Sequence, residues 1–240
     1  MKGRLLAVAI GVFLAAGCAG GDSEGNETSP PPPASEPLEE LLLEVERTRP
    51  GVVLRDFVRA AARRDERRMW QRLSVPTRRR LGPTLDGFRG DAAQALELEF
   101  ASLGRRHELI LSQTITSTFA VAAVARGAEA YAAALRLENG LWRVELGSPV
   151  RILPLRPKPA ETVPRRTQLA AEVTAGATIV EAGLWLDGVA FPTRGGGATP
   201  SELTMFGEAS ALPAGAHSVV AFASTGANAA ARAWTFRASQ

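Results

Sequence analysis

The sequence predicts an α+β domain followed by an all-β sandwich, with an N-terminal signal and a disordered tether in front of them. Apolar residues recur at helical spacing in the first part, as in 54–61, whereas short runs of β-branched and small apolar residues predict strands after His107. A proline-rich stretch then separates two groups of strands. The expected boundaries are 1–17 for the signal, 18–37 for the tether, 38–148 for the α+β domain, 149–166 for a linker and 167–240 for the sandwich.

The first residues have the three regions of a secretory signal. Lys2 and Arg4 precede the apolar run 5–14, and small residues then lead to Cys18, the only cysteine of the chain. The run is shorter than the ~20 apolar residues that span a membrane. We expect cleavage after Gly17 and acylation of Cys18, with palmitate or a similar chain, which anchors the protein to the cell membrane outside the cytoplasm. The alternative is an ordinary signal peptide with an incidental cysteine.

Composition narrows the class of partner. Residues 18–37 are polar and rich in Gly and Pro, so we expect a disordered tether.

The chain has 28 basic and 25 acidic side chains, and loss of Lys2 and Arg4 with the signal lowers the formal charge from +3 to +1. Such a small charge argues against a nucleic-acid partner. With Cys18 acylated, no disulfide can form within the chain.

Helix signals are distributed through the first part of the α+β domain. An apolar stripe predicts a helix at 54–61, and Asp65 is expected to cap the next helix. Asp91 and Gln94 form a capping-box pattern before a further helix. Gly104 suits the position just after the end of that helix.

A hairpin is the strongest strand signal. Asn139-Gly140 is typical of a two-residue type I′ turn, which pairs Leu137 with Trp142 and Leu135 with Val144 on one face. Arg136 then opposes Arg143 on the other face, with Glu138 and Glu145 diagonally across to offset the repulsion. Strands are expected at 109–118, 119–126 and 128–137, and in the second group at 168–174, 179–186, 189–191, 202–206, 218–223 and 233–237.

Two parts of the chain resemble known families. The helix from Leu54, the break at Asp65, the run 70–74 (WQRLS) and the run 137–144 (LENGLWRV) resemble the NTF2-like (SnoaL-like) cone fold and its lipoprotein members. This resemblance implies helices wrapped against a bent sheet that leaves a conical pocket.

The second resemblance lies in the sandwich. The run 212–223 (LPAGAHSVVAFA), the Trp234-Thr235-Phe236 strand and Trp185 before an Asp-Gly turn resemble bacterial Ig-like domains of surface proteins. Together with the predicted signal before Cys18, these two resemblances make the chain similar to a bacterial lipoprotein with a cone domain and a C-terminal Ig-like domain.

Candidate pocket residues follow from strand parity. Glu129 and Tyr131 share a face with Leu135, and His107 at the start of a strand can approach them. Catalytic relatives in the cone-fold family use a carboxylate base with a Tyr or acid donor, or a His and Asp pair, so the resemblance implies a ligand or isomerase-like pocket here. The alternative is that Tyr131 only packs and Glu129 sits at the rim.

An arginine-rich segment offers a second candidate. Residues 55–80 carry ten arginines, of which Arg63, Arg64, Arg67 and Arg68 are candidate contacts to anionic lipid or an acidic wall polymer. The alternative is the solvated side of amphipathic helices. The two histidines, His107 and His217, fall in different domains without clustered acidic residues, so the sequence predicts no metal site and no cofactor.

We therefore expect a non-catalytic, membrane-anchored envelope lipoprotein that acts as a binding or scaffold module at the cell surface. Its expected partners are the membrane, through lipidated Cys18, and an envelope protein or wall polymer, with no nucleic acid. The alternative function is a small-ligand-binding or isomerase-like pocket protein.

Overall fold

The computed structural model describes residues 49–104 and 106–239. The predicted signal, Cys18, the tether and the first residues of the predicted α+β domain lie outside this part of the chain. Among the described residues, no helix combines the length and the apolar character that crossing a membrane requires.

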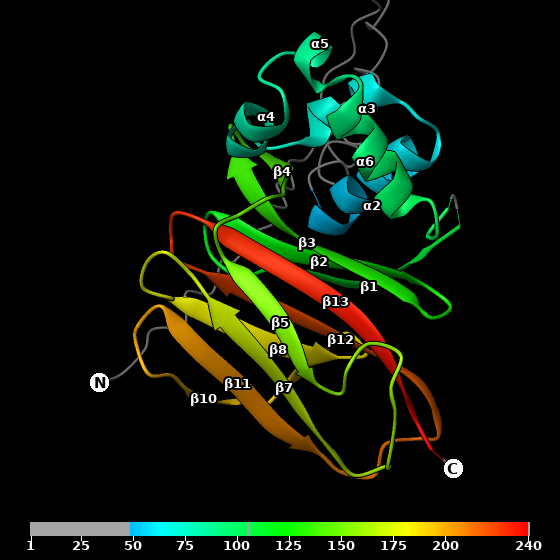
Figure 1. Cartoon of the computed structure of the whole chain (residues 1–240), viewed down its shortest axis with the longest axis vertical. Coiled ribbons are helices and arrows are strands. Elements are labelled where there is room, and N and C mark those ends of the chain that lie inside the picture. The colour runs from blue at the N-terminus through cyan, green and yellow to red at the C-terminus, as the bar shows by residue number, and fades with distance from the viewer. Residues whose placement is uncertain (1–48, 105, 240) are drawn as a thin grey trace, which may run out of the picture. The chain divides into compact units, whose positions relative to one another are not determined.

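The helices form one group at the start of the described chain (Figure 1). Pro50 opens the first helix, where its fixed φ and missing N–H suit the first helical position. Asp65 caps the next helix, as predicted, by accepting a 3.0 Å hydrogen bond from the Arg68 N–H. The capping box at Asp91 does not form, because the chain enters that helix through Gly90 at φ 88°. The helices are α2 (Pro50–Ala62), α3 (Glu66–Arg72), α4 (Val75–Leu81), α5 (Leu85–Phe88) and α6 (Asp91–Phe100).

Three sheets follow. The first sheet has the order β1-β2-β3-β4, with β1 (Glu108–Thr114), β2 (Phe119–Arg126), β3 (Glu129–Glu138) and β4 (Leu141–Glu145). The middle sheet has the order β6-β13-β12-β8-β9, with β6 (Thr162–Val163), β13 (Ala229–Ala238), β12 (Gly215–Ser224), β8 (Glu181–Leu186) and β9 (Val189–Phe191). The outer sheet has the order β10-β11-β7-β5, with β10 (Arg194–Gly196), β11 (Glu202–Ala209), β7 (Thr167–Thr174) and β5 (Arg151–Arg156).

The predicted β3–β4 hairpin register is confirmed. Leu137 pairs with Trp142, Leu135 with Val144, and Arg136 with Arg143. Asn139 and Gly140 have φ of 51° and 77°, as a type I′ turn requires. Tight-turn chemistry thus determines the alignment of these two strands.

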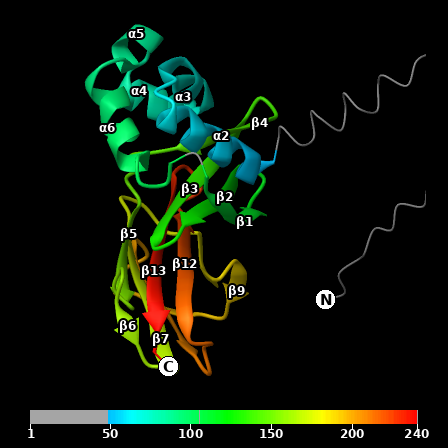
Figure 2. The same cartoon turned by 90° about the vertical axis from the view of Figure 1, so that its right-hand side faces the viewer.

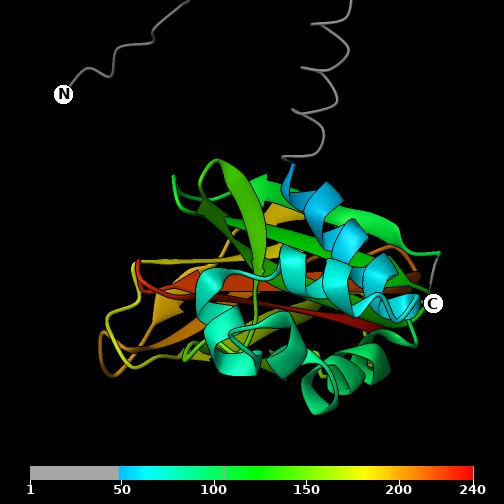
Figure 3. The same ribbon diagram turned by 90° about the horizontal axis from the view of Figure 1, so that it is seen from above.

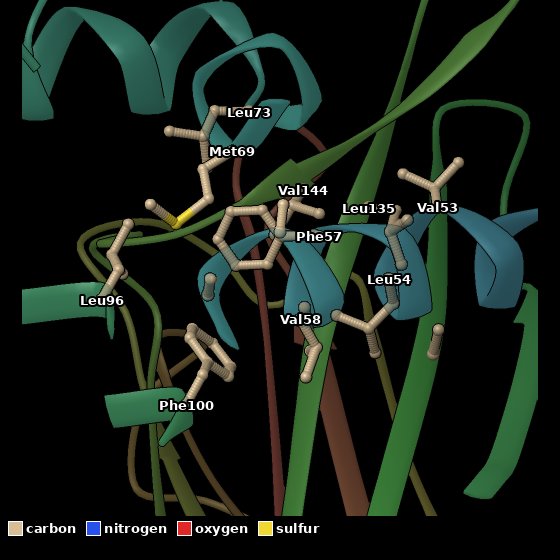
Figure 4. Packing of buried hydrophobic residues seen from close by; sticks show 14 of the residues in the cluster. Val53, Leu54, Phe57, Val58, Met69, Leu73, Leu96, Phe100, Leu135 and Val144 are labelled. Atoms are coloured by element: carbon tan, nitrogen blue, oxygen red, sulfur yellow. The ribbon is translucent and has the colours of Figure 1, made fainter. Parts of the chain in front are cut away.

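The helices and the three sheets are stacked in layers (Figure 2). A buried core lies between each pair of neighbouring layers. Seen from above, the helices lie over the first sheet (Figure 3), and α2 contacts β1 and β2. The helix core lies between them and includes Leu54, Phe57, Met69, Phe100 and Val144 (Figure 4). The inter-sheet core, between the first and middle sheets, includes Phe119, Val121, Trp185, Val220 and Phe222. The outer core, between the middle and outer sheets, includes Leu169, Val173, Leu184, Val219 and Trp234.

Alternation along β2 shows how one strand serves two cores. Ala120, Ala122 and Val124 belong to the helix core, whereas Phe119 and Val121 belong to the inter-sheet core. All are fully buried. An uninterrupted apolar run is the pattern of a strand covered on both faces.

Small residues line the contact between β3 and β13. Five alanines, which we call the alanine seam, lie there in the inter-sheet core: Ala132 and Ala134 of β3 with Ala229, Ala231 and Ala233 of β13. Short side chains allow two strands of facing sheets to approach closely.

The predicted fold class, an α+β cone domain followed by an Ig-like sandwich, is wrong. Of the described residues, 46% lie in strands, which form three sheets, and 22% lie in helices; this part of the chain contains no clear NTF2-like cone. The physical reason is that the first sheet is apolar on both faces of its central strands, β2 and β3. Its second face packs on the middle sheet, so the first sheet is an internal layer of a larger stack.

The stretch 149–166, expected to be a linker, instead contributes strands. β5 pairs with β7, and β6 pairs in parallel with β13. Pro154 is tolerated because β5 is an edge strand and the register shifts between Pro154 and Arg156.

Candidate functional site

An arginine pocket lies among α3, α4 and β4. It has a volume of about 590 Å³, and its lining residues are Asp65, Arg67, Arg68, Gln71, Arg72, Arg78 and Arg143. Five arginines and one acidic residue, Asp65, thus line this depression. Guanidinium groups present several N–H donors in a planar fork, which matches carboxylate and phosphate oxygens.

Contacts with Asp56 of α2 and with Trp70 hold three of the pocket's arginines in place. Arg68 and Arg72 are one helical turn apart, and both donate to Asp56 Oδ2, at 3.3 and 2.8 Å. The guanidinium of Arg78 lies 4.6 Å from the centre of the Trp70 ring, and the Trp70 indole N–H donates to the Gly82 carbonyl at 3.0 Å. Aromatic and carboxylate contacts therefore orient three of the five cations.

Arg143 reaches the pocket from the strand β4. Its guanidinium donates to the Gln71 carbonyl at the end of α3. Burial lowers the pKa of Arg143, the neighbouring cations Arg72 and Arg78 lower it further, and Glu138 acts in the opposite direction. Like charges held together at this cost favour an anion between them.

The structure divides the four arginines singled out from the sequence. Arg67 and Arg68 line the pocket. Arg63 instead follows the end of α2, and Arg64 has φ 57° and lies 3.7 Å from Glu97 on α6. The turn before Asp65 thus separates Arg63 and Arg64 from the pocket that Arg67 and Arg68 line.

A second site, which we call the acidic groove, lies between α6, β3, β5 and β13. It has a volume of about 700 Å³ and includes Glu99, Glu129 and Tyr131 among its lining residues. The Tyr131 ring packs edge-on against Phe100, with centroids 4.4 Å apart. Burial and then the charge of Glu99 raise the pKa of Tyr131, and burial raises the pKa of Glu99. Glu129 and Tyr131 both line this groove, together with Ala130 and Ala132 of the opposite parity, so the lining does not test the parity prediction.

His107 does not line this groove. Its Nδ1 lies 3.3 Å from the Gly104 carbonyl, and its Nε2 is buried without a partner in the described part of the chain. Burial lowers the pKa of His107, and the nearby cations Arg59 and Arg55 lower it further, against a raising contribution from the Gly104 carbonyl. His107 therefore belongs to the environment of α2.

Glu145, which lines the acidic groove, is the most deeply buried carboxylate that the structure describes. Its side chain is 0% exposed, and it accepts a 2.9 Å bond from Arg136 Nε and a 2.7 Å bond from the Ser74 hydroxyl. Arg80 lies 3.4 Å from its other oxygen. Sequence reasoning placed Glu145 beside Arg136 but missed Ser74 and Arg80, which come from the distant α4 region.

His217 has an acidic partner that the sequence did not indicate. Its Nδ1 lies 2.7 Å from Asp187 Oδ2, and its Nε2 lies 2.9 Å from the Pro213 carbonyl. Because both neighbours are acceptors, the ring satisfies both contacts only as the imidazolium cation. Within residues 49–104 and 106–239, no group of three or more His, Cys, Asp or Glu side chains is placed to hold a metal ion.

Comparison with known proteins gives little guidance. No protein family profile and no curated protein matches this sequence. Among solved structures, the chain is similar to the endo-β-1,4-mannanase from Thermotoga petrophila, at 10% sequence identity and a TM-score of 0.32. That similarity covers 62% of this chain and 24% of the mannanase, so the chain spans about a quarter of that protein's length.

Proposed function

We propose that this chain is a non-catalytic binding or scaffold module of the cell envelope, anchored through lipid on Cys18, and that the arginine pocket is its binding site. The observation that carries the proposal is that five arginines line one pocket. The ligand is an anionic group, a phosphate or carboxylate, of an envelope polymer.

Charge balance supports this assignment. Asp65 is the only carboxylate that lines the pocket, and Asp56 accepts from Arg68 and Arg72 beside it. No ion pair with an acidic side chain of the described chain involves Arg67, Arg78 or Arg143. A polyanion supplies the missing charge and accepts several N–H donors at once.

Binding of inorganic polyphosphate to the purified soluble chain, measured by calorimetry, tests the proposal. We expect affinity to fall steeply between roughly 50 and 500 mM salt, because exposed charges are screened over a few ångströms at high salt. The double variant Arg67→Gln/Arg78→Gln should weaken binding about tenfold, which corresponds to ~1.4 kcal/mol.

The matched control is Arg63→Gln/Arg64→Gln, which removes the same charge from the same helical region but outside the pocket. This control should bind within about twofold of the parent chain. Equal losses in both double variants would mean that diffuse charge, and not the pocket, attracts the polymer. Binding that is insensitive to both would overturn the assignment.

Crosslinking in cells followed by mass spectrometry tests the anchored role. A partner that the lipidated protein captures should be lost or reduced in the Cys18→Ala variant. Equal capture in the variant would contradict the need for an anchor.

The acidic groove favours a second candidate function, small-ligand binding or an isomerase-like activity. Tyr131 and Glu129 line it together. A proton-abstracting base must lie within hydrogen-bond reach of its substrate, so Glu129→Gln should abolish turnover of a bound ketone substrate while leaving its binding intact. Turnover unchanged in that variant would dismiss the idea.

A further inference from the structure

The acidic groove is bordered by strand edges as well as by side chains. Its lining includes consecutive residues of β3, 129–133, and consecutive residues of β13, 230–233. Consecutive residues of a strand point their side chains to opposite faces, so a groove that touches all of them runs along the strand's edge.

The edge of β3 is unpaired beside the groove. The Leu137 N–H donates to the Thr118 carbonyl on the β2 side, so odd-numbered residues of β3 bond toward β2 and even-numbered ones away from it. On that second side β4 pairs only with residues 134–138. In the described part of the chain, the backbone groups of Ala130 and Ala132 therefore face the groove without a strand partner.

The edge of β13 is similar. The Thr235 carbonyl and the Arg237 N–H bond to the 160–161 segment, and β6 pairs only with Arg237 and Ala238. By the same alternation, Ala231 and Ala233 direct their backbone groups away from β12. Two strand edges thus meet one groove.

The charge beside the β3 edge is negative. Glu99 on α6 and Glu129 on β3 line the groove, and neither forms an ion pair among the described residues. Arg126 lies opposite Glu129 in the β2–β3 register, and its guanidinium donates to the Ser102 carbonyl at 3.2 Å. Glu145 also lines it but is held by Arg136 and Arg80. Arg232 lies at the β5 end, where it contacts the Ile152 carbonyl at 3.4 Å. Leu96, Leu103 and Ile152 form apolar walls.

We propose that the acidic groove binds an extended, basic segment of a partner protein, which adds as a strand to the unpaired edge of β3. Backbone bonds to Ala130 and Ala132 supply affinity, and cationic side chains opposite Glu99 and Glu129 supply specificity. The five residues 129–133 offer an edge of roughly 17 Å, enough for four or five residues of a strand. This site is separate from the arginine pocket and takes a ligand of opposite charge.

Hydrogen exchange with the capped peptide Lys-Val-Lys-Val-Lys-Val tests the proposal. Saturating peptide should slow exchange of the Ala130 and Ala132 amides about tenfold and leave the β1 amides unchanged. The peptide Glu-Val-Glu-Val-Glu-Val should not bind. Methylation of alternate peptide nitrogens should abolish binding, because it removes the donors that a strand requires. Unchanged affinity after methylation, or binding without protection of these two amides, would overturn the proposal.

Variants separate charge from folding. Glu99→Gln/Glu129→Gln should weaken peptide binding about tenfold, while Glu97→Gln, on the same helix but outside the groove, should leave it within about twofold. Circular dichroism should show all of these variants folded. If lysine amide alone binds as tightly as the peptide, the occupant is a small cation and strand addition is refuted.

Discussion

The helix core and the alanine seam bury the two faces of β3 by different means. Phe57, Phe88 and Phe100 fill the helix core with large side chains. The seam between β3 and β13 is filled by methyl groups alone. Large side chains fill the wide spacing between helix and sheet, whereas small ones let two strands lie close together. The helix core should therefore be sensitive to lost volume, and the seam to added volume.

Loss of volume in the helix core should have the largest effect. Phe57 is fully buried and its ring lies 5.3 Å from that of Phe100. Phe57→Ala should lower the free energy of unfolding by about 3–5 kcal/mol, as measured by urea denaturation. Leu98→Ala, at a side chain that is 70% exposed, should change it by under about 0.5 kcal/mol. A small loss at Phe57 would mean that the helix layer contributes little to global stability.

Added volume in the seam should come next. Ala134→Leu places a larger side chain between β3 and β13 and should cost about 1–3 kcal/mol. Ala133→Leu is the matched control, because Ala133 points to the other face and lines the acidic groove. Urea denaturation should show a smaller loss in the control. Equal losses would indicate that the two faces are equally tight.

A polar contact beside the inter-sheet core should have a smaller effect. The Trp185 indole N–H of β8 donates to Gln113 Oε1 of β1 at 2.8 Å, which joins the middle sheet to the first. A double-mutant cycle with Trp185→Phe and Gln113→Ala should give a coupling energy of about 1 kcal/mol. A coupling near zero would show that side-chain packing alone joins the sheets here.

His217, which packs beside the outer core, should make the free energy of unfolding depend slightly on pH. Burial opposes the charge of His217, but bonds to Asp187 and Pro213 outweigh it and raise the pKa. The stabilisation is therefore complete below the unfolded-state pKa of about 6.5 and is lost as pH rises through the higher folded-state pKa. Because Asp187 is half exposed, the change should be about 1 kcal/mol or less.

Unfolding measured between pH 5 and 9 checks this dependence against His217→Gln. The parent chain should lose stability relative to the variant as pH rises. A parent-minus-variant difference that grows with pH would have the wrong sign for an imidazolium held by a carboxylate.

Much of the local order was predictable from the sequence, the Asp91 capping box excepted, but the stacking of layers was not. The Asp65 cap and the Asn139-Gly140 turn depend on neighbouring residues, and both form as expected. The uninterrupted apolar run of β2 does indicate burial on both faces, but it does not name the sheet that covers the second face. β5 was missed because Pro154, with Pro149 and Pro157 on either side of the strand, suggested a linker, although edge strands tolerate proline.

The candidate sites show the same division. Glu129 and Tyr131 both line the acidic groove, as do Ala130 and Ala132 of the opposite parity, and helical spacing relates Arg68 to Arg72. Arg143 joins the pocket only through tertiary packing, as Asp187 joins His217 across 30 residues. Proximity in sequence misled the prediction at Arg63 and Arg64, because the turn before Asp65 separates them from Arg67.

The position of β13 bears on the order in which this protein becomes folded. Its alanines complete the inter-sheet core, and Trp234 and Phe236 on its opposite face complete the outer core. A chain made from its N-terminus forms the β3–β4 hairpin early but cannot close either core until residues 229–238 are free. Contacts this distant in sequence make folding slow, and the exposed second face of the first sheet is a surface for aggregation until then. Deleting β13 should therefore leave a collapsed, aggregation-prone species in place of a shorter folded protein.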